Sequence, residues 1–126
     1  MSFKFDPNRP IYLQIIEEIK KRTVRGQYLV GTQLPSVREM ARAMGVNPNT
    51  MARAYMELER EGFISSRRGQ GSFICDDPRR LDAERRRLAE AARGQFVSEI
   101  GDLGLDAKQI EELLAPIRGE LNHDRD

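Results

Sequence analysis

The sequence predicts an α+β fold, in which three helices and a β-hairpin are followed by a helical C-terminal region. Three observations predict it. Capping signals at Ser36 and Asn47 mark the starts of two short helices, with Gly45 between them. Two short apolar runs then flank the glycine-rich residues 67–71, as in a hairpin. From Pro78 onward, apolar residues recur at helical spacing.

The first helix is expected to begin at Pro10 and to run to about Arg25. Its apolar face consists of Ile11, Tyr12, Ile15, Ile16 and Ile19. Several cations near its end complement the helix dipole, and we interpret them as a mostly solvated face. They are Lys20, Lys21, Arg22 and Arg25. A loop is expected at residues 26–31.

Ser36 begins the second predicted helix. Its hydroxyl can accept from the amide of Glu39 while the Glu39 carboxylate accepts from the amide of Ser36, which is a capping box. Gly45 can end this helix, because glycine adopts the left-handed conformation at little cost. Asn47 caps the third predicted helix, with Pro48 at the first position, where a missing amide is harmless. Two helices joined by so short a turn match the helix-turn-helix motif.

The third predicted helix ends at Gly62 and presents polar groups on its exposed face. These groups, on Asn49, Thr50 and Arg53, can hydrogen-bond to phosphates or to base edges in a major groove. Tyr55 has two possible roles, as a core residue or as a phosphate contact, and the core role is favoured.

The hairpin that follows is expected to use Phe63-Ile64 and Ser72-Phe73-Ile74 as its strands. Its predicted tip consists of Arg67, Arg68, Gly69, Gln70 and Gly71. Two cations on a flexible turn suit contact with a phosphate backbone or a minor groove. The hairpin therefore has the character of a wing.

In this order the motifs resemble the winged helix-turn-helix domain of the GntR family of bacterial transcription regulators, from about Pro10 to Ile74. The stretches Asn47-Pro48-Asn49-Thr50 and Gly69-Gln70-Gly71 are closest to the short YtrA-type subfamily and to the related MocR type. The resemblance implies a sequence-specific DNA-binding regulator, and a repressor. Pro48 stands where many members carry a guanine-reading arginine, so the base that is read here does not follow from the family.

The residues expected to contact DNA come from the helix-turn-helix and from the wing. They are Ser36, Arg38, Asn47, Asn49, Thr50, Arg53, Arg67, Arg68, Gly69, Gln70 and Gly71. Ser36 has a second role as a cap. Arg38 is included because the resemblance implies it.

The sequence divides into a predicted winged helix-turn-helix domain at 1–75 and a helical dimerisation region at 76–126. A long helix is expected from Pro78 to about Gly101–Gly104, with its arginines between 79 and 87 on a solvated face. Asp106, with Gln109 three residues later, caps a last helix, which Pro116 should kink or end. Residues 121–126 are expected to be a frayed tail.

The C-terminal helices carry more apolar surface than the two of them can cover. Its residues are Leu88, Phe96, Ile100, Ile110, Leu113, Leu114 and Ile117. The same surface on a second copy is the simplest partner, so a homodimer is expected. In YtrA-type regulators a short C-terminal helical pair forms the dimer, and the resemblance implies the same here. The dimer is expected to read an inverted repeat.

Charge is distributed unevenly along the 126 residues. Residues 1–75 hold 12 Lys and Arg against 7 Asp and Glu, a charge of +5, whereas the remainder carries −4. Only the first part is therefore expected to face a polyanion such as double-stranded DNA. The single Cys75, the lack of a signal peptide and the lack of a membrane-spanning run predict a cytoplasmic protein.

Two other functions compete with DNA binding. MocR-type enzymes carry a similar head on a pyridoxal-phosphate domain, but this chain has no room for that domain and shows no cofactor lysine motif. No cofactor, metal site or catalytic residue is therefore expected. The second alternative is a winged helix that binds another protein, which the basic wing disfavours. Whether a small-molecule effector controls the protein stays open.

Overall fold

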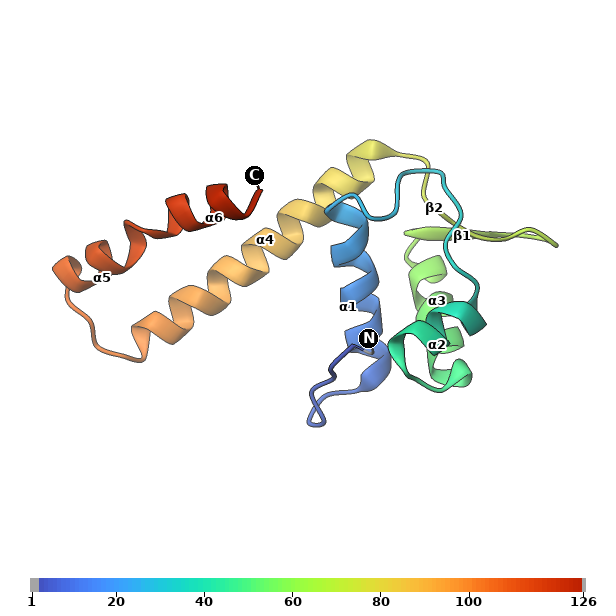
Figure 1. Ribbon diagram of the computed structural model, residues 1–126, viewed down its shortest axis with the longest axis horizontal. Helices are drawn as coiled ribbons and strands as arrows, with labels where there is room; N and C mark the ends of the chain where they lie inside the picture. The colour runs from blue at the N-terminus through green and yellow to red at the C-terminus, as the bar shows by residue number, and fades with distance from the viewer. Residues whose placement is uncertain (1–2, 126) are drawn as a thin grey trace. The chain divides into compact units, whose positions relative to one another are not determined.

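A computed structural model describes residues 3–125, which form two compact units (Figure 1). The first unit ends at Leu88 and the second begins at Ala89, so the division falls inside a helix. The elements are α1 (Ile11–Val24), α2 (Val37–Met44), α3 (Pro48–Arg60), β1 (Ile64–Arg67), β2 (Gly71–Ile74), α4 (Pro78–Gly101), α5 (Ala107–Leu114) and α6 (Ile117–Arg125). The α+β fold class is confirmed, whereas the division into functional domains at residue 75 stays a prediction.

The core of the first unit lies where α1 and α2 pack against α3 and the base of the hairpin (Figure 1). Each helix contributes the apolar side chains that its 3.6-residue period places on one face. Fully buried members are Ile15, Ile19, Met40, Met44, Met51, Leu58, Phe63 and Ile74. Burial of one such side chain is worth about 1.5–3 kcal/mol, so this core holds the helix-turn-helix and the hairpin as one body.

The predicted helix boundaries of the helix-turn-helix are confirmed. The Ser36 hydroxyl accepts from the Glu39 amide at 3.1 Å, and the Glu39 carboxylate accepts from the Ser36 amide at 2.9 Å. Gly45 ends α2 with φ of 71°, in the left-handed conformation. Asn47 accepts from the Asn49 amide at 2.7 Å and so caps α3.

The hairpin is longer than the sequence predicted, and its tip is narrower. β1 and β2 pair antiparallel from Ile64–Ile74 to Arg67–Gly71, so Arg67 and Gly71 belong to the strands and only residues 68–70 turn. A third segment also pairs with β2: the Leu34 amide donates to the carbonyl of Ser72 at 2.8 Å. This pairing was not predicted, because the segment is too short to show strand alternation.

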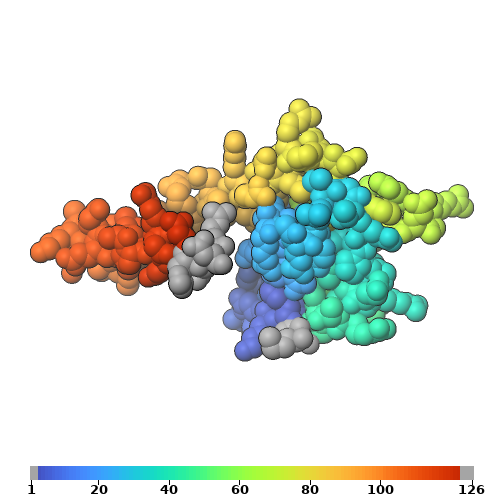
Figure 2. Space-filling model, turned by 45° about the horizontal axis from the view of Figure 1, so that its top comes forward, coloured from blue at the N-terminus to red at the C-terminus, as the bar shows by residue number. Residues whose placement is uncertain are grey.

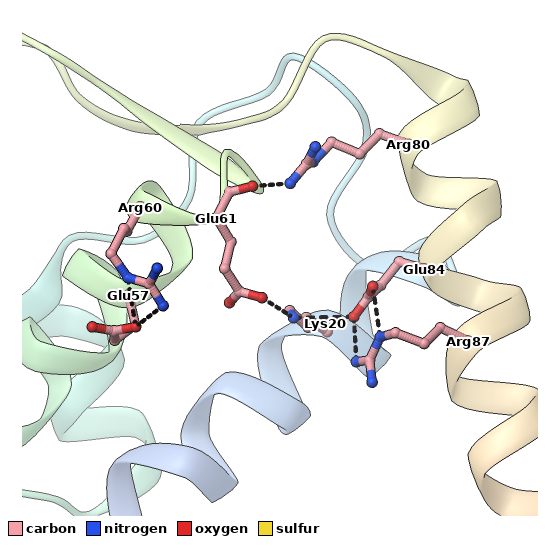
Figure 3. Close-up of polar contacts among 7 residues, drawn as sticks. All are labelled: Lys20, Glu57, Arg60, Glu61, Arg80, Glu84 and Arg87. Atoms are coloured by element: carbon pink, nitrogen blue, oxygen red, sulfur yellow. Dashed lines mark hydrogen bonds and ion pairs between the residues drawn. The ribbon is translucent and has the colours of Figure 1, made fainter.

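The expected solvated face at the end of α1 is wrong for Lys20, which is only 6% exposed. Its ammonium lies 3.0 Å from Glu61, which caps α3, and 3.1 Å from Glu84 on α4 (Figure 3). Arg87 pairs with Glu84 at 2.6 Å, and Arg80 donates to the carbonyl of Glu61 (Figure 3). The solvated interpretation of the α4 arginines is therefore also incomplete. Arg87 pairs within α4, but Arg80 donates to Glu61, and Arg85 donates to the carbonyl of Val24 at the end of α1 at 2.6 Å.

The second unit contains the rest of α4 with α5 and α6. The predicted capping box at Asp106 and Gln109 is confirmed, with hydrogen bonds of 2.8 and 3.0 Å. Pro116 ends α5, as expected, but α6 follows it to Arg125, so the expected frayed tail is wrong as far as that residue. Proline cannot continue the previous helix but suits the start of a new one. Asp126 lies outside the described residues.

Candidate nucleic-acid interface

The N-terminal turns of α3 carry the side chains that were predicted to read DNA. Asn49 and Arg53 are exposed, and Thr50 is half-buried. The Asn47 side chain is engaged in its cap, which leaves less of it for a ligand. Asn49 and Thr50 lie four and three residues before Arg53, so each of them shares a face of the helix with Arg53. The structure thus brings these three side chains together.

Two of the predicted arginines rest on aromatic rings. The Arg53 guanidinium carbon lies 3.8 Å from the centroid of the Tyr12 ring, which belongs to α1. The Arg67 guanidinium carbon lies 4.0 Å from the centroid of the Phe73 ring on β2. Both are cation–π contacts, well within the distance at which such contacts are favourable.

The ion pairs of the described residues fall mostly outside the helix-turn-helix and the wing. Most arginines of α1, α4 and the end of α3 pair with carboxylates within 4.0 Å, among them Arg22, Arg60 and Arg87, whereas Arg80 and Arg86 of α4 have no such pair in the described part of the chain. The helix-turn-helix and wing contribute a second group, for which residues 3–125 provide no such carboxylate. This group consists of Arg38, Arg42, Arg53, Arg67 and Arg68, all of them exposed. Their charge is available to an anion from outside.

Arg42 was missed at the sequence level. It lies one helical turn after Arg38 on α2, and both side chains are exposed. The spacing of four residues places the two guanidinium groups on one face, which is the signal that could have found it.

Tyr55 is a core residue, as the favoured interpretation held. It is almost fully buried, and its hydroxyl donates to the carbonyl of Pro35 at 2.6 Å. Burial raises the pKa of the phenol, so the hydroxyl keeps its proton for this bond. The bond ties α3 to the residue before Ser36 and thereby fixes the two helices of the motif.

The wing tip is held by the segment that precedes α2. The Gln33 side-chain amide donates to the carbonyl of Gln70. Gly71 has φ of 108°, a conformation that favours glycine, and a Cβ atom there would lie 2.7 Å from that amide nitrogen and would displace the Gln33 side chain. Figures 1 and 2 show the hairpin tip protruding from the three helices. Arg68 and Gly69 at this tip are exposed. DNA contact by these and by the other predicted residues stays a prediction.

A head of three helices with a helix-turn-helix and a basic hairpin defines the winged helix-turn-helix class of proteins. Residues 11–74 match the profile of the bacterial regulatory proteins of the gntR family. The chain belongs to the GntR family.

Two relatives from Bacillus subtilis match nearly the whole chain. The uncharacterised HTH-type transcriptional regulator YhcF is 43% identical over 89% of this chain and 93% of its own. The HTH-type transcriptional repressor YtrA is 34% identical over 94% of this chain and 93% of its own. The resemblance to short YtrA-type regulators is thereby confirmed.

Solved structures agree with the fold. A GntR family regulator from Listeria monocytogenes is 38% identical, with a TM-score of 0.79 over 87% of this chain and 96% of its own. The DNA-binding domain of AraR in complex with operator ORX1 is 26% identical, with a TM-score of 0.54 over 60% of this chain and 95% of its own.

Proposed function

We propose that the protein is a homodimeric, sequence-specific DNA-binding repressor of transcription. In this proposal α3 enters a major groove, and the wing contacts the adjacent backbone or minor groove. The observation that carries it is the group of exposed arginines on α2, α3 and the wing that have no carboxylate partner among the described residues. DNA phosphates are the partner that such a group fits.

The predicted dimer surface supports the homodimer. None of its seven residues is buried within the chain: Leu88, Ile100, Ile110 and Ile117 are half-buried, and Phe96, Leu113 and Leu114 are exposed. Exposed apolar side chains in such number on a charged protein are typical of an interaction site. A second copy carries the same apolar surface, and a two-fold axis would bring the two surfaces together. The two DNA-binding domains would then read an inverted repeat with half-sites about 10 bp, or a multiple of it, apart.

Repression rather than activation is proposed from the likeness to YtrA, which is named a repressor.

As a DNA-binding regulator the protein acts in the cytoplasm, and no catalytic step is assigned to it. No helix within residues 3–125 is long and apolar enough to cross a membrane. A small-molecule effector is compatible with this function but is not needed by it.

The salt dependence of DNA binding tests the proposal. Replacing Arg67 and Arg68 by alanine should weaken binding to all duplex DNA and reduce the slope of log K against log salt by about 0.9 for each phosphate that is no longer neutralised. The matched control replaces Arg79 and Arg86, two exposed cations on α4, and should leave the slope unchanged. Equal slopes for the wing variant and the parent would overturn the wing's role. A parent that binds no duplex would overturn the function and favour a protein-interaction module.

A further inference from the structure

Arg53 and Arg67 are held differently from the other arginines whose contacts the structure describes. Arg22 and Arg60 are fixed by carboxylates, at 2.7 Å from Glu18 and 2.8 Å from Glu57. Arg53 and Arg67 lie instead over the faces of aromatic rings. The two ways of holding a guanidinium have different consequences for what it can still bind.

A guanidinium carries its five N–H donors in the plane of the group. A carboxylate binds along that plane, so it occupies donors and neutralises the charge. A ring face binds the flat side of the group and leaves the in-plane donors and the charge free. An arginine whose guanidinium stacks on a ring face is therefore restrained, and it can still make a bidentate contact with a guanine edge or a phosphate.

Both aromatic residues lie on backbone that is held in place. Tyr12 is half-buried and packs against the core, on a helix that is packed directly against α3. Phe73 lies in the middle of the sheet, because it pairs with Ser65 on one side and with Gln33 on the other. Neither aromatic residue belongs to the DNA-binding set that the sequence predicted, and each contacts an arginine of that set.

We propose that Tyr12 and Phe73 are positioning residues for DNA recognition, which hold Arg53 and Arg67 in a restrained and fully charged state before DNA arrives. The inference rests on the proposed DNA-binding function. Its physical basis is the entropy of a long side chain, which falls on binding unless the side chain is already ordered. Removal of either aromatic ring should therefore weaken DNA binding by about two- to fivefold for each DNA-binding domain, as expected for loss of an exposed cation–π contact.

The test uses the full-length protein and a duplex that the parent selects from random DNA. Tyr12→Leu should weaken binding to this duplex, whereas Tyr12→Phe, which keeps the ring face, should bind like the parent. Leu13→Ala, at an exposed position of the same helix, is the matched control and should have no effect. Thermal unfolding of each variant shows whether the head stays folded.

A double-mutant cycle separates positioning from general damage. In the background of Arg53→Ala, Tyr12→Leu should have no further effect on affinity, because the arginine through which it is proposed to act has been removed. The same holds for Phe73→Leu in the background of Arg67→Ala. An equal reduction of affinity with and without the arginine would overturn the inference, as would parental affinity of both leucine variants. A parent that selects no duplex would instead overturn the proposed function, so the two failures are distinguishable.

Discussion

At the scale of single residues, the sequence predicted those roles that depend on near neighbours. The caps at Ser36 and Asn47 were predictable, because each cap and its partner lie within three residues. The burial of Lys20 was not, because its carboxylates lie 41 and 64 residues away in the sequence. The Lys20 ammonium depends on these carboxylates, because without them it would be a buried and unpaired charge.

Glu84 is one of these carboxylates, and its ionisation should make stability depend on pH. The hydrogen bond from Arg87, followed by that from Lys20, lowers the pKa of Glu84 below its ordinary value against the effect of burial. A carboxyl whose pKa is lower in the folded state stabilises fully above its unfolded pKa, near 4.5, and less as the pH falls through the folded pKa. Acid should therefore weaken this contribution.

Glu84→Gln is accordingly expected to lower the free energy of unfolding at pH 7 by about 1.5–3 kcal/mol, the range for a hydrogen bond to a charged group. The variant should also lose less stability than the parent between about pH 6 and pH 3. Urea unfolding at several pH values measures both. Glu90→Gln, which removes an exposed pair with Arg93, is the control and should change stability by less than about 0.5 kcal/mol. Parallel pH profiles for the parent and Glu84→Gln would contradict this account.

At the scale of elements, helices were predicted well and β pairing less well. A helix signals its start, its period and its end within a few residues, as α2 and α5 do with complete capping boxes. The pairing of Gln33 with Phe73 leaves no such local trace, because its partners are distant in the sequence. Similarly, α6 was not predicted, because a proline such as Pro116 is compatible both with the end of one helix and with the start of another.

The N-terminus of α2 allows a cap to be separated from a DNA contact. Ser36→Asp keeps an oxygen that accepts from the Glu39 amide, and aspartate is as good an N-cap as serine. Thermal stability should therefore stay within about 0.5 kcal/mol of the parent, whereas Ser36→Ala should cost about 1 kcal/mol. If Ser36 faces a phosphate, the added charge will repel DNA, so Ser36→Asp should bind DNA more weakly than Ser36→Ala. Equal DNA affinity of the two variants would restrict Ser36 to its capping role.

At the scale of the whole molecule, the unexplained apolar surface is that of the second unit. Leu113 is 39% exposed and Leu114 is 42% exposed, and α5 has no buried residue. The periodicity of the sequence predicted these apolar positions, but it could not say what covers them, because a partner copy leaves no mark in a single chain.

Leu113→Asp together with Ile117→Asp should yield a monomer, because each buried leucine or isoleucine is worth about 1.5–3 kcal/mol and the carboxylates would be buried without partners. The head should stay folded, since neither residue belongs to its core. Analytical ultracentrifugation measures the mass, and circular dichroism measures the folding. Leu29→Asp, at an exposed leucine of the first unit, is the control and should stay dimeric. A dimeric double variant would place the interface elsewhere.

The central claim is that two copies together read one inverted DNA site, and selection from random duplex DNA tests it most directly. The parent protein is incubated with the pool at about physiological salt, where non-specific binding is weak, and the bound duplexes are sequenced. The account predicts an enriched inverted repeat whose half-sites lie about 10 bp, or a multiple of it, apart. Enrichment of no sequence, or of a single site without two-fold symmetry, would contradict it.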